Sequence, residues 1–154
     1  MSKGWPGKYF RPSEFACSCG RCSMDKVKPE LVKVLDKARE HLGVPLRINS
    51  GVRCDNHNLA VGGVSTSLHL GYPLKGKVAD RIGFAADVTY SNAGLRNPLN
   101  MCRLYMALES FGRPISLGLG LYPSFVHVDV RGLQGRKAAR WADRHFGWGR
   151  LHHD

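Results

Sequence analysis

The segment Phe125-Val-His-Val-Asp-Val-Arg131 decides the fold, because its alternation of residue types is typical of a half-buried β-strand. Alternate residues of a strand face opposite ways, so the valines at 126, 128 and 130 should fill the core. His127, Asp129 and Arg131 then share the other face with Phe125. A histidine and a carboxylate side by side on a rigid strand suit a metal ligand with a catalytic or orienting neighbour. The alternative is a solvated face that carries an Asp–Arg pair.

Further strands are predicted close to this segment. Residues 116–122 should pair with residues 125–130 as a hairpin that turns at Pro123-Ser124. A short strand is also expected at residues 46–49. A long polar, glycine-rich loop follows from Ser50 to about Phe84, and loops of this length in a compact domain are usually functional or mobile.

Two helices are predicted from their end signals and apolar periodicity. The first begins near Pro29 and ends at Gly43. Its apolar stripe consists of Leu31, Val34, Leu35, Ala38 and Leu42. The second begins behind Asn97 as the cap and stops near Gly112. The elements predict an α+β fold in which a small antiparallel sheet packs with helices.

The length of 154 residues fits one domain spanning 1–154. Residues 1–24 look irregular and contain cysteines, and residues 135–147 are predicted to form a basic helix that carries Trp141 and Phe146. That helix either contacts an anionic envelope surface or packs its aromatic residues on the core. We expect the protein to be a monomer.

The net charge of +11 and the pI of about 9.8 indicate polyanionic partners, among which nucleic acid, anionic lipid and the bacterial envelope all qualify. No stretch reaches the roughly 18 apolar residues of a membrane span. The first residues lack the apolar segment of a secretory signal. We therefore expect synthesis in the bacterial cytoplasm and release through a lysis pore or another export route.

Two further segments contain potential metal ligands. His69 lies in Ser67-Leu-His-Leu-Gly71, and Asp87 ends the run Gly83-Phe-Ala-Ala-Asp87. Two histidines and one carboxylate from separate elements form the open three-ligand zinc site of hydrolases. The residues must converge for this to hold, and spacing leaves open a surface histidine at 69 and a turn or cap residue at 87.

The chain resembles the zinc D-alanyl-D-alanine carboxypeptidase family, which includes phage endolysins that cut the L-alanyl-D-glutamate bond. The resemblance runs from about Phe15 to Arg131. It rests on six segments in order, which are Glu14-Phe-Ala-Cys-Ser-Cys-Gly20, Asn49-Ser-Gly-Val-Arg53, Asn58-Leu-Ala-Val-Gly-Gly63, Ser67-Leu-His69, Gly83-Phe-Ala-Ala-Asp87 and Phe125-Val-His-Val-Asp-Val-Arg131. The resemblance implies one catalytic zinc held by His69, Asp87 and His127. It also implies that Arg53 and Ser67 bind substrate.

The sequence departs from the family pattern in two places. Seventeen residues separate His69 from Asp87, more than is usual in the family, so residues 72–82 look inserted and Asp80 is a rival ligand. The positions shortly before His127, where relatives often have a proton acceptor, hold Ser124 and Phe125. Asp129 is therefore the candidate general base. Its alternative role is to orient the His127 ring or to pair with Arg131.

The cysteines at 17, 19 and 22 leave two interpretations open. They form a structural metal site completed by Cys54, or they are free buried thiols, which is the commoner case. The odd count of five cysteines, with Cys102 apart, argues against a fully paired disulfide framework.

The resemblance implies a zinc metallopeptidase that hydrolyses peptidoglycan stem peptides, of the D,D-carboxypeptidase or L-Ala-D-Glu endopeptidase type. A phage or prophage endolysin is the expected role, with a host-encoded wall enzyme as the alternative. One alternative is a non-catalytic wall-binding or virion module that retains the metal. The other is a nucleic-acid binder, which explains the charge but none of the ordered motifs, so we expect peptidoglycan and no nucleic acid as the partner.

Overall fold

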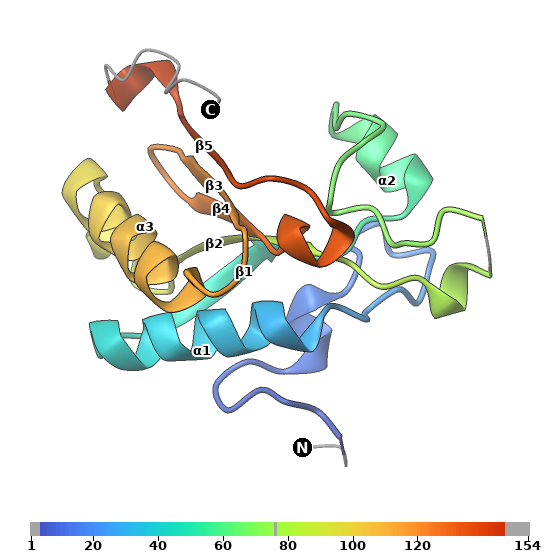
Figure 1. Ribbon diagram of the computed structural model, residues 1–154, viewed down its shortest axis with the longest axis horizontal. Helices are drawn as coiled ribbons and strands as arrows, with labels where there is room; N and C mark the ends of the chain where they lie inside the picture. Colours follow the sequence, from blue (N-terminus) through green and yellow to red (C-terminus); the bar gives the residue numbers. More distant parts are fainter. Residues whose placement is uncertain (1–3, 76, 147–154) are drawn as a thin grey trace.

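The computed structural model describes residues 4–75 and 77–146, in which a five-stranded, mostly antiparallel sheet packs with helices (Figure 1). The helices are α1 (Pro29–Leu42), α2 (Asp55–Ala60) and α3 (Pro98–Gly112). The strands are β1 (Leu46–Ser50), β2 (Ala85–Tyr90), β3 (Gly118–Leu121), β4 (Val126–Asp129) and β5 (Ala139–Ala142), in the order β1-β2-β4-β3-β5. The α+β prediction is confirmed.

The end signals of α1 and α3 act as the sequence predicts. Pro29 is the first residue of α1, and Gly43 ends the helix in the left-handed conformation with φ of 68°. The Asn97 side chain caps α3 by accepting from the backbone N–H of Asn100. The two helices pack against each other, and their buried faces join one hydrophobic core with Val88 and the valines of β4.

The β3–β4 hairpin turns at Pro123-Ser124 as predicted. Its valines at 126, 128 and 130 are completely buried, as the alternation requires. Cross-strand register then sets a row of partners in which Asp87 of β2 lies opposite His127 of β4, His127 opposite Gly120 of β3, and Gly120 opposite Trp141 of β5. Directly paired residues share a face of a sheet, so the register places Asp87, His127 and Trp141 on one face.

The prediction of a basic helix over residues 135–147 is wrong. Residues 139–142 form β5, which pairs in parallel with β3, and residue 147 lies outside the described part of the chain. The reason is tertiary. The Ala139 N–H donates to the Leu117 carbonyl, and Gly120 leaves free the space that the Trp141 indole occupies. These tertiary contacts override the local helix propensity of the segment.

The predicted loop from Ser50 to Phe84 also contains structure that the sequence did not reveal. It includes the six-residue helix α2 and a 3-10 turn at Val78–Asp80. The small-residue run that ends in Asp87 continues as β2, a central strand buried along its whole length. Periodicity does not identify a short, fully buried strand of this kind. In the described ranges, no helix has both the length and the apolarity needed to cross a membrane.

Candidate metal centre

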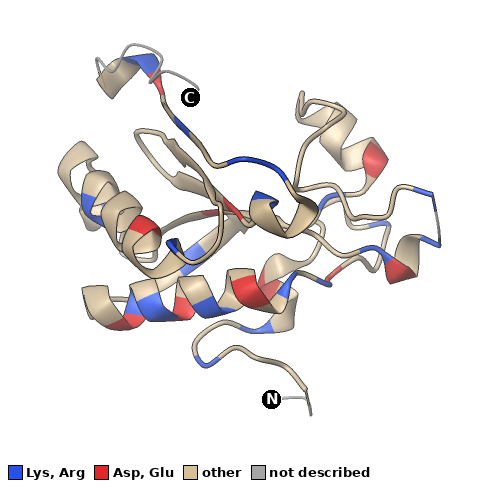
Figure 2. Ribbon diagram, in the orientation of Figure 1, with Lys and Arg blue, Asp and Glu red and all other residues tan. Residues whose placement is uncertain are grey.

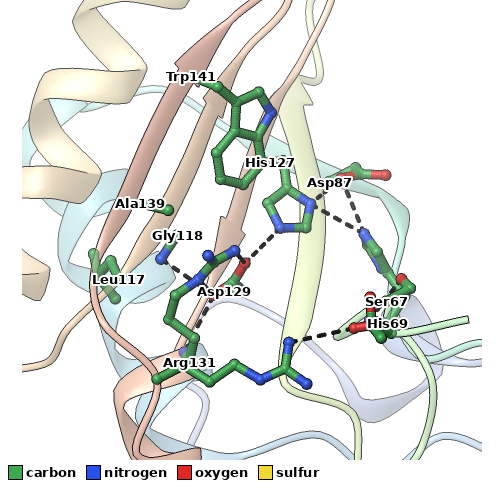
Figure 3. A network of polar contacts seen from close by, with 12 residues as sticks. Ser67, His69, Asp87, Leu117, Gly118, His127, Asp129, Arg131, Ala139 and Trp141 are labelled. Carbon is green, nitrogen blue, oxygen red and sulfur yellow. Dashed lines mark hydrogen bonds and ion pairs between the residues drawn. The ribbon is translucent and has the colours of Figure 1, made fainter. Parts of the chain in front are cut away.

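Three side chains from separate elements bring their potential ligand atoms together. The Nε2 atom of His69 lies 3.2 Å from Asp87 Oδ1 and 3.2 Å from His127 Nδ1. His127 Nδ1 lies 3.0 Å from the same Asp87 oxygen. Asp87 and His127 are neighbours across the β2–β4 pair, and His69 approaches from the loop that follows α2 (Figure 3). The convergence that the zinc hypothesis required is therefore present.

His69 is held by the backbone of residues 51–53. Its Nδ1 atom lies 2.7 Å from the Gly51 carbonyl, so that nitrogen carries the proton and leaves Nε2 free to bind a metal. The Arg53 N–H donates to the His69 carbonyl at 2.7 Å. Burial lowers the pKa of His69, and Asp87 offsets this effect only in part. The ring is therefore held neutral near pH 7, the form that metal binding needs.

His127 is held from the opposite side by Asp129. The Nε2 atom of His127 donates to Asp129 Oδ2 at 2.8 Å, which directs Nδ1 at His69 and Asp87 (Figure 3). Burial alone would lower the pKa of His127, but hydrogen bonds to Asp129 and Asp87 outweigh it and raise the pKa. A carboxylate behind a ligating histidine fixes its tautomer and makes it a stronger ligand.

The Asp129 carboxylate is fully committed to its neighbours. Besides His127, it accepts from the Gly118 N–H and from three nitrogens of Arg131, over distances of 2.8–3.1 Å. Its side chain is only 1% exposed. Burial alone would raise its pKa, but hydrogen bonds from Arg131 and His127 hold the pKa well below its ordinary value. Because Asp129 lies behind the far nitrogen of His127, these contacts favour the orienting role over the general base.

Asp87 is supported by Arg53. The Nη2 atom of Arg53 donates to Asp87 Oδ2 at 3.2 Å, while its Nε atom donates to Ser50 Oγ at 2.9 Å. Burial alone would raise the pKa of Asp87, but its contacts with His127 and His69 hold the pKa well below its ordinary value. Asp87 is thus ionised at neutral pH with Oδ1 directed at the two rings.

These ligand atoms form the floor of a pocket of about 460 Å³. Tyr122 and Phe125 stack on one wall with ring centroids 4.4 Å apart. Trp141 forms another wall, and its Nε1 atom donates to the Tyr122 hydroxyl. Arg136 is exposed at the rim and donates to the Thr66 carbonyl at 3.4 Å. The pocket therefore joins a polar floor, aromatic walls and a cation at its edge.

The donor set fits zinc. Tetrahedral zinc with nitrogen and oxygen ligands at roughly 2.0–2.2 Å places those ligands about 3.3 Å apart. The three ligand atoms here are 3.0–3.2 Å apart, so small movements would accommodate the ion. Three protein ligands facing a pocket also leave a position for water or substrate, as in catalytic zinc sites.

The structure also decides between the two aspartates that were candidates for the carboxylate ligand. Asp87 belongs to the cluster, whereas Asp80 is exposed in the segment 72–82. That segment is closed at its base by backbone pairing between Tyr72 and Ile82. None of its described residues, 72–75 and 77–82, lines the metal pocket. These observations are consistent with the hypothesis that residues 72–82 are an inserted loop, which leaves the geometry of the ligands intact.

Ser67 and Arg53 both line the pocket, but each also has a local partner. Ser67 Oγ accepts from the His69 N–H at 3.3 Å, and Arg53 is bonded to Asp87. Sequence reasoning missed Arg136 and Trp141 as pocket residues. Both lie in the segment interpreted as a terminal helix, and only the pairing of β5 with β3 brings them to the pocket. No sequence signal identified that pairing.

Comparison with known proteins agrees with this geometry. The sequence profile of the family Peptidase M15 matches residues 8–129, a range that covers most of the chain and contains His69, Asp87 and His127. The chain therefore belongs to the peptidase M15 family. No curated protein matches the chain. Family membership together with the His–Asp–His cluster supports a zinc-dependent peptidase that acts on peptidoglycan.

Proposed function

We propose that the chain hydrolyses a peptide bond in peptidoglycan stem peptides, as a D,D-carboxypeptidase or an L-Ala-D-Glu endopeptidase. The observation that carries the proposal is the convergence of His69 Nε2, Asp87 Oδ1 and His127 Nδ1 on the floor of an open pocket. A zinc ion bound there would polarise the scissile carbonyl and lower the pKa of a bound water to about 7.

The residues around the ligands would hold the centre in one geometry. Asp129 and Gly51 accept the protons on the far nitrogens of the two histidines, and Arg53 orients Asp87. Fixing ligands through such outer contacts maintains both metal affinity and the direction of the open position.

Substrate binding is assigned to the walls of the pocket. The Tyr122–Phe125 stack and Trp141 offer apolar surface for peptide side chains. Arg131 is committed to Asp129, and Arg53 to Asp87 and Ser50. Arg136 is therefore the lining cation best placed to bind a carboxylate of the stem peptide. Lys and Arg recur along the segment between the 3-10 turn at Arg131–Gln134 and β5 (Figure 2). This basic segment would also favour contact with the anionic envelope.

We further propose that the protein acts as a phage or prophage endolysin and reaches the wall after release from the cytoplasm. The high positive charge supports a role at the anionic envelope. The endolysin role rests on the resemblance stated above.

One observation favours a second candidate, a wall-binding module that keeps the metal without turnover. Asp87 and Asp129 are the only carboxylate residues among the described residues that line the pocket, and both are hydrogen-bonded. Mass spectrometry of purified peptidoglycan after incubation with the zinc-loaded protein separates the two candidates. New fragments name the bond that is cut, and their absence from the His127→Ala digest ties the cut to the centre. Binding to peptidoglycan without any new fragment would replace the peptidase proposal with the module.

A further inference from the structure

A second cluster of potential metal ligands lies outside the pocket described above. Cys17, Cys19 and Cys22 come from the irregular N-terminal segment, and Cys54 immediately precedes α2. Their four sulfur atoms all lie within 4.8 Å of one another. Residues separated by more than thirty positions thus converge on one point.

The sulfur separations match a tetrahedral metal site. Cys17 Sγ lies 3.8 Å from Cys54 Sγ, and Cys19 Sγ lies 3.5 Å from Cys22 Sγ. Zinc held by thiolates at roughly 2.3 Å places the sulfur atoms about 3.8 Å apart. A disulfide requires about 2.05 Å between sulfurs, and all four cysteines are free. We propose that Cys17, Cys19, Cys22 and Cys54 together bind a structural zinc ion.

The backbone around the cluster is arranged to support thiolates. The Arg21 N–H donates to Cys19 Sγ at 3.3 Å, and the Cys54 N–H donates to Cys17 Sγ at 3.4 Å. The His57 N–H in the first turn of α2 donates to Cys54 Sγ at 3.4 Å. Hydrogen bonds from N–H groups stabilise negative charge on the acceptor atom, which metal-bound sulfur carries.

The position of the cluster links the N-terminal segment to the residues that support the metal centre. Cys54 directly follows Arg53, which holds Asp87, and Gly51 accepts from His69. The Val52 N–H donates to the Phe15 carbonyl at 2.9 Å, so the backbone next to Cys54 is already hydrogen-bonded to the N-terminal segment next to Cys17. A metal bridge between Cys17 and Cys54 would lock this junction, and would hold Gly51 and Arg53 in place.

Disulfides are the competing outcome, since the close pairs Cys17–Cys54 and Cys19–Cys22 could oxidise. A metal explains why all four sulfurs meet at one point, whereas two disulfides require only two separate pairs. The sequence also leaves Cys102 apart on α3, so it serves as a matched control.

The test counts metal in full-length protein purified under reducing conditions. In the His127→Ala background, which removes the pocket ion, we expect about one zinc per chain, as for a four-thiolate site. Adding Cys22→Ser should remove that zinc, whereas adding Cys102→Ser should not. Absence of zinc from the His127→Ala protein would overturn the proposal, as would its retention after Cys22→Ser.

A second measurement uses the wild-type chain and so avoids variants that fail to fold. Loading with cobalt should give the sulfur-to-cobalt charge-transfer bands of a thiolate site, which the His–Asp–His cluster cannot produce. The proposal would be overturned if cobalt-loaded protein lacked these bands. It would also be overturned if the protein purified under reducing conditions had four of its thiols in disulfides. Neither readout depends on hydrolysis, so the outcome is distinguishable from failure of the peptidase proposal.

Discussion

Changing Asp129 to Asn should weaken zinc binding by about 10- to 100-fold, the usual effect of losing an outer partner of a metal ligand. Asp129 accepts five hydrogen bonds, and one of them comes from His127 Nε2. An asparagine offers only one oxygen, so its amide nitrogen must face either His127 and Arg131 Nη2, or Gly118 N–H together with the backbone N–H and Nε of Arg131.

Both orientations have a cost. If the amide nitrogen faces His127, the ring accepts at Nε2 and carries its proton on Nδ1, which blocks the atom that would bind zinc. If the oxygen faces His127, buried donors of Gly118 and Arg131 lose their acceptor, at about 1–3 kcal/mol for an unsatisfied group. A cost of that size corresponds to about 5- to 150-fold in binding, which spans the predicted loss.

The assay measures zinc affinity by competition with a chelator, and then the hydrolysis rate at saturating zinc. We expect weaker affinity for Asp129→Asn and a rate that recovers to within about tenfold once zinc is saturating, because general-base loss typically costs 10²- to 10⁴-fold. The control is Asp143→Asn, since Asp143 contacts His145 at the same two-residue spacing but outside the pocket. Unchanged affinity together with a rate at least about 100-fold lower would refute the orienting role and identify Asp129 as the base.

Three further predictions concern the ligands and the rim of the pocket. Asp87→Ala should abolish zinc binding at the pocket while Asp80→Ala retains it, and elemental analysis showing the reverse would exchange the two assignments. Arg136→Ala should raise KM for stem peptides by about tenfold with kcat little changed, because the charged contact is made equally before and during the reaction. Lys137→Ala, at the exposed neighbouring residue, is the control variant. Because the pKa of His127 is raised above 6.5 in the metal-free protein, protons should begin to displace zinc above pH 6.5 as the pH falls, and full affinity maintained well below that pH would contradict the contact with Asp129.

The predictable part of the fold is the part with local signals. Pro29 and Gly43 mark the ends of α1, Asn97 caps α3, and the alternating valines identify β4. In contrast, β5 depends on Gly120 leaving room on β3 for the Trp141 side chain. A contact between distant segments of this kind leaves no periodicity in either of them.

The candidate site was likewise predictable where its signals are local, and not where it depends on contacts between distant segments. Strand alternation placed His127 and Asp129 on one face, but it did not reveal that Asp129 would be buried. Its burial follows from Arg131, which folds back onto the carboxylate. His69 and Asp87 lie on either side of residues 72–82, the segment that looks inserted. Their spacing in the sequence therefore did not pair them, and the resemblance to a family was needed. The meeting of Cys54 with the N-terminal cysteines was likewise a matter of tertiary structure.

We propose that a zinc ion held by His69, Asp87 and His127 is required for hydrolysis of peptidoglycan. The most direct test follows the rate of peptidoglycan hydrolysis by chelator-stripped protein as zinc is added back. We expect no hydrolysis without metal, and recovery on adding zinc to the wild type and to the control His41→Ala, whose residue is exposed. We expect no recovery for His127→Ala. Hydrolysis by fully stripped protein, or full recovery of the His127→Ala variant, would contradict the proposal.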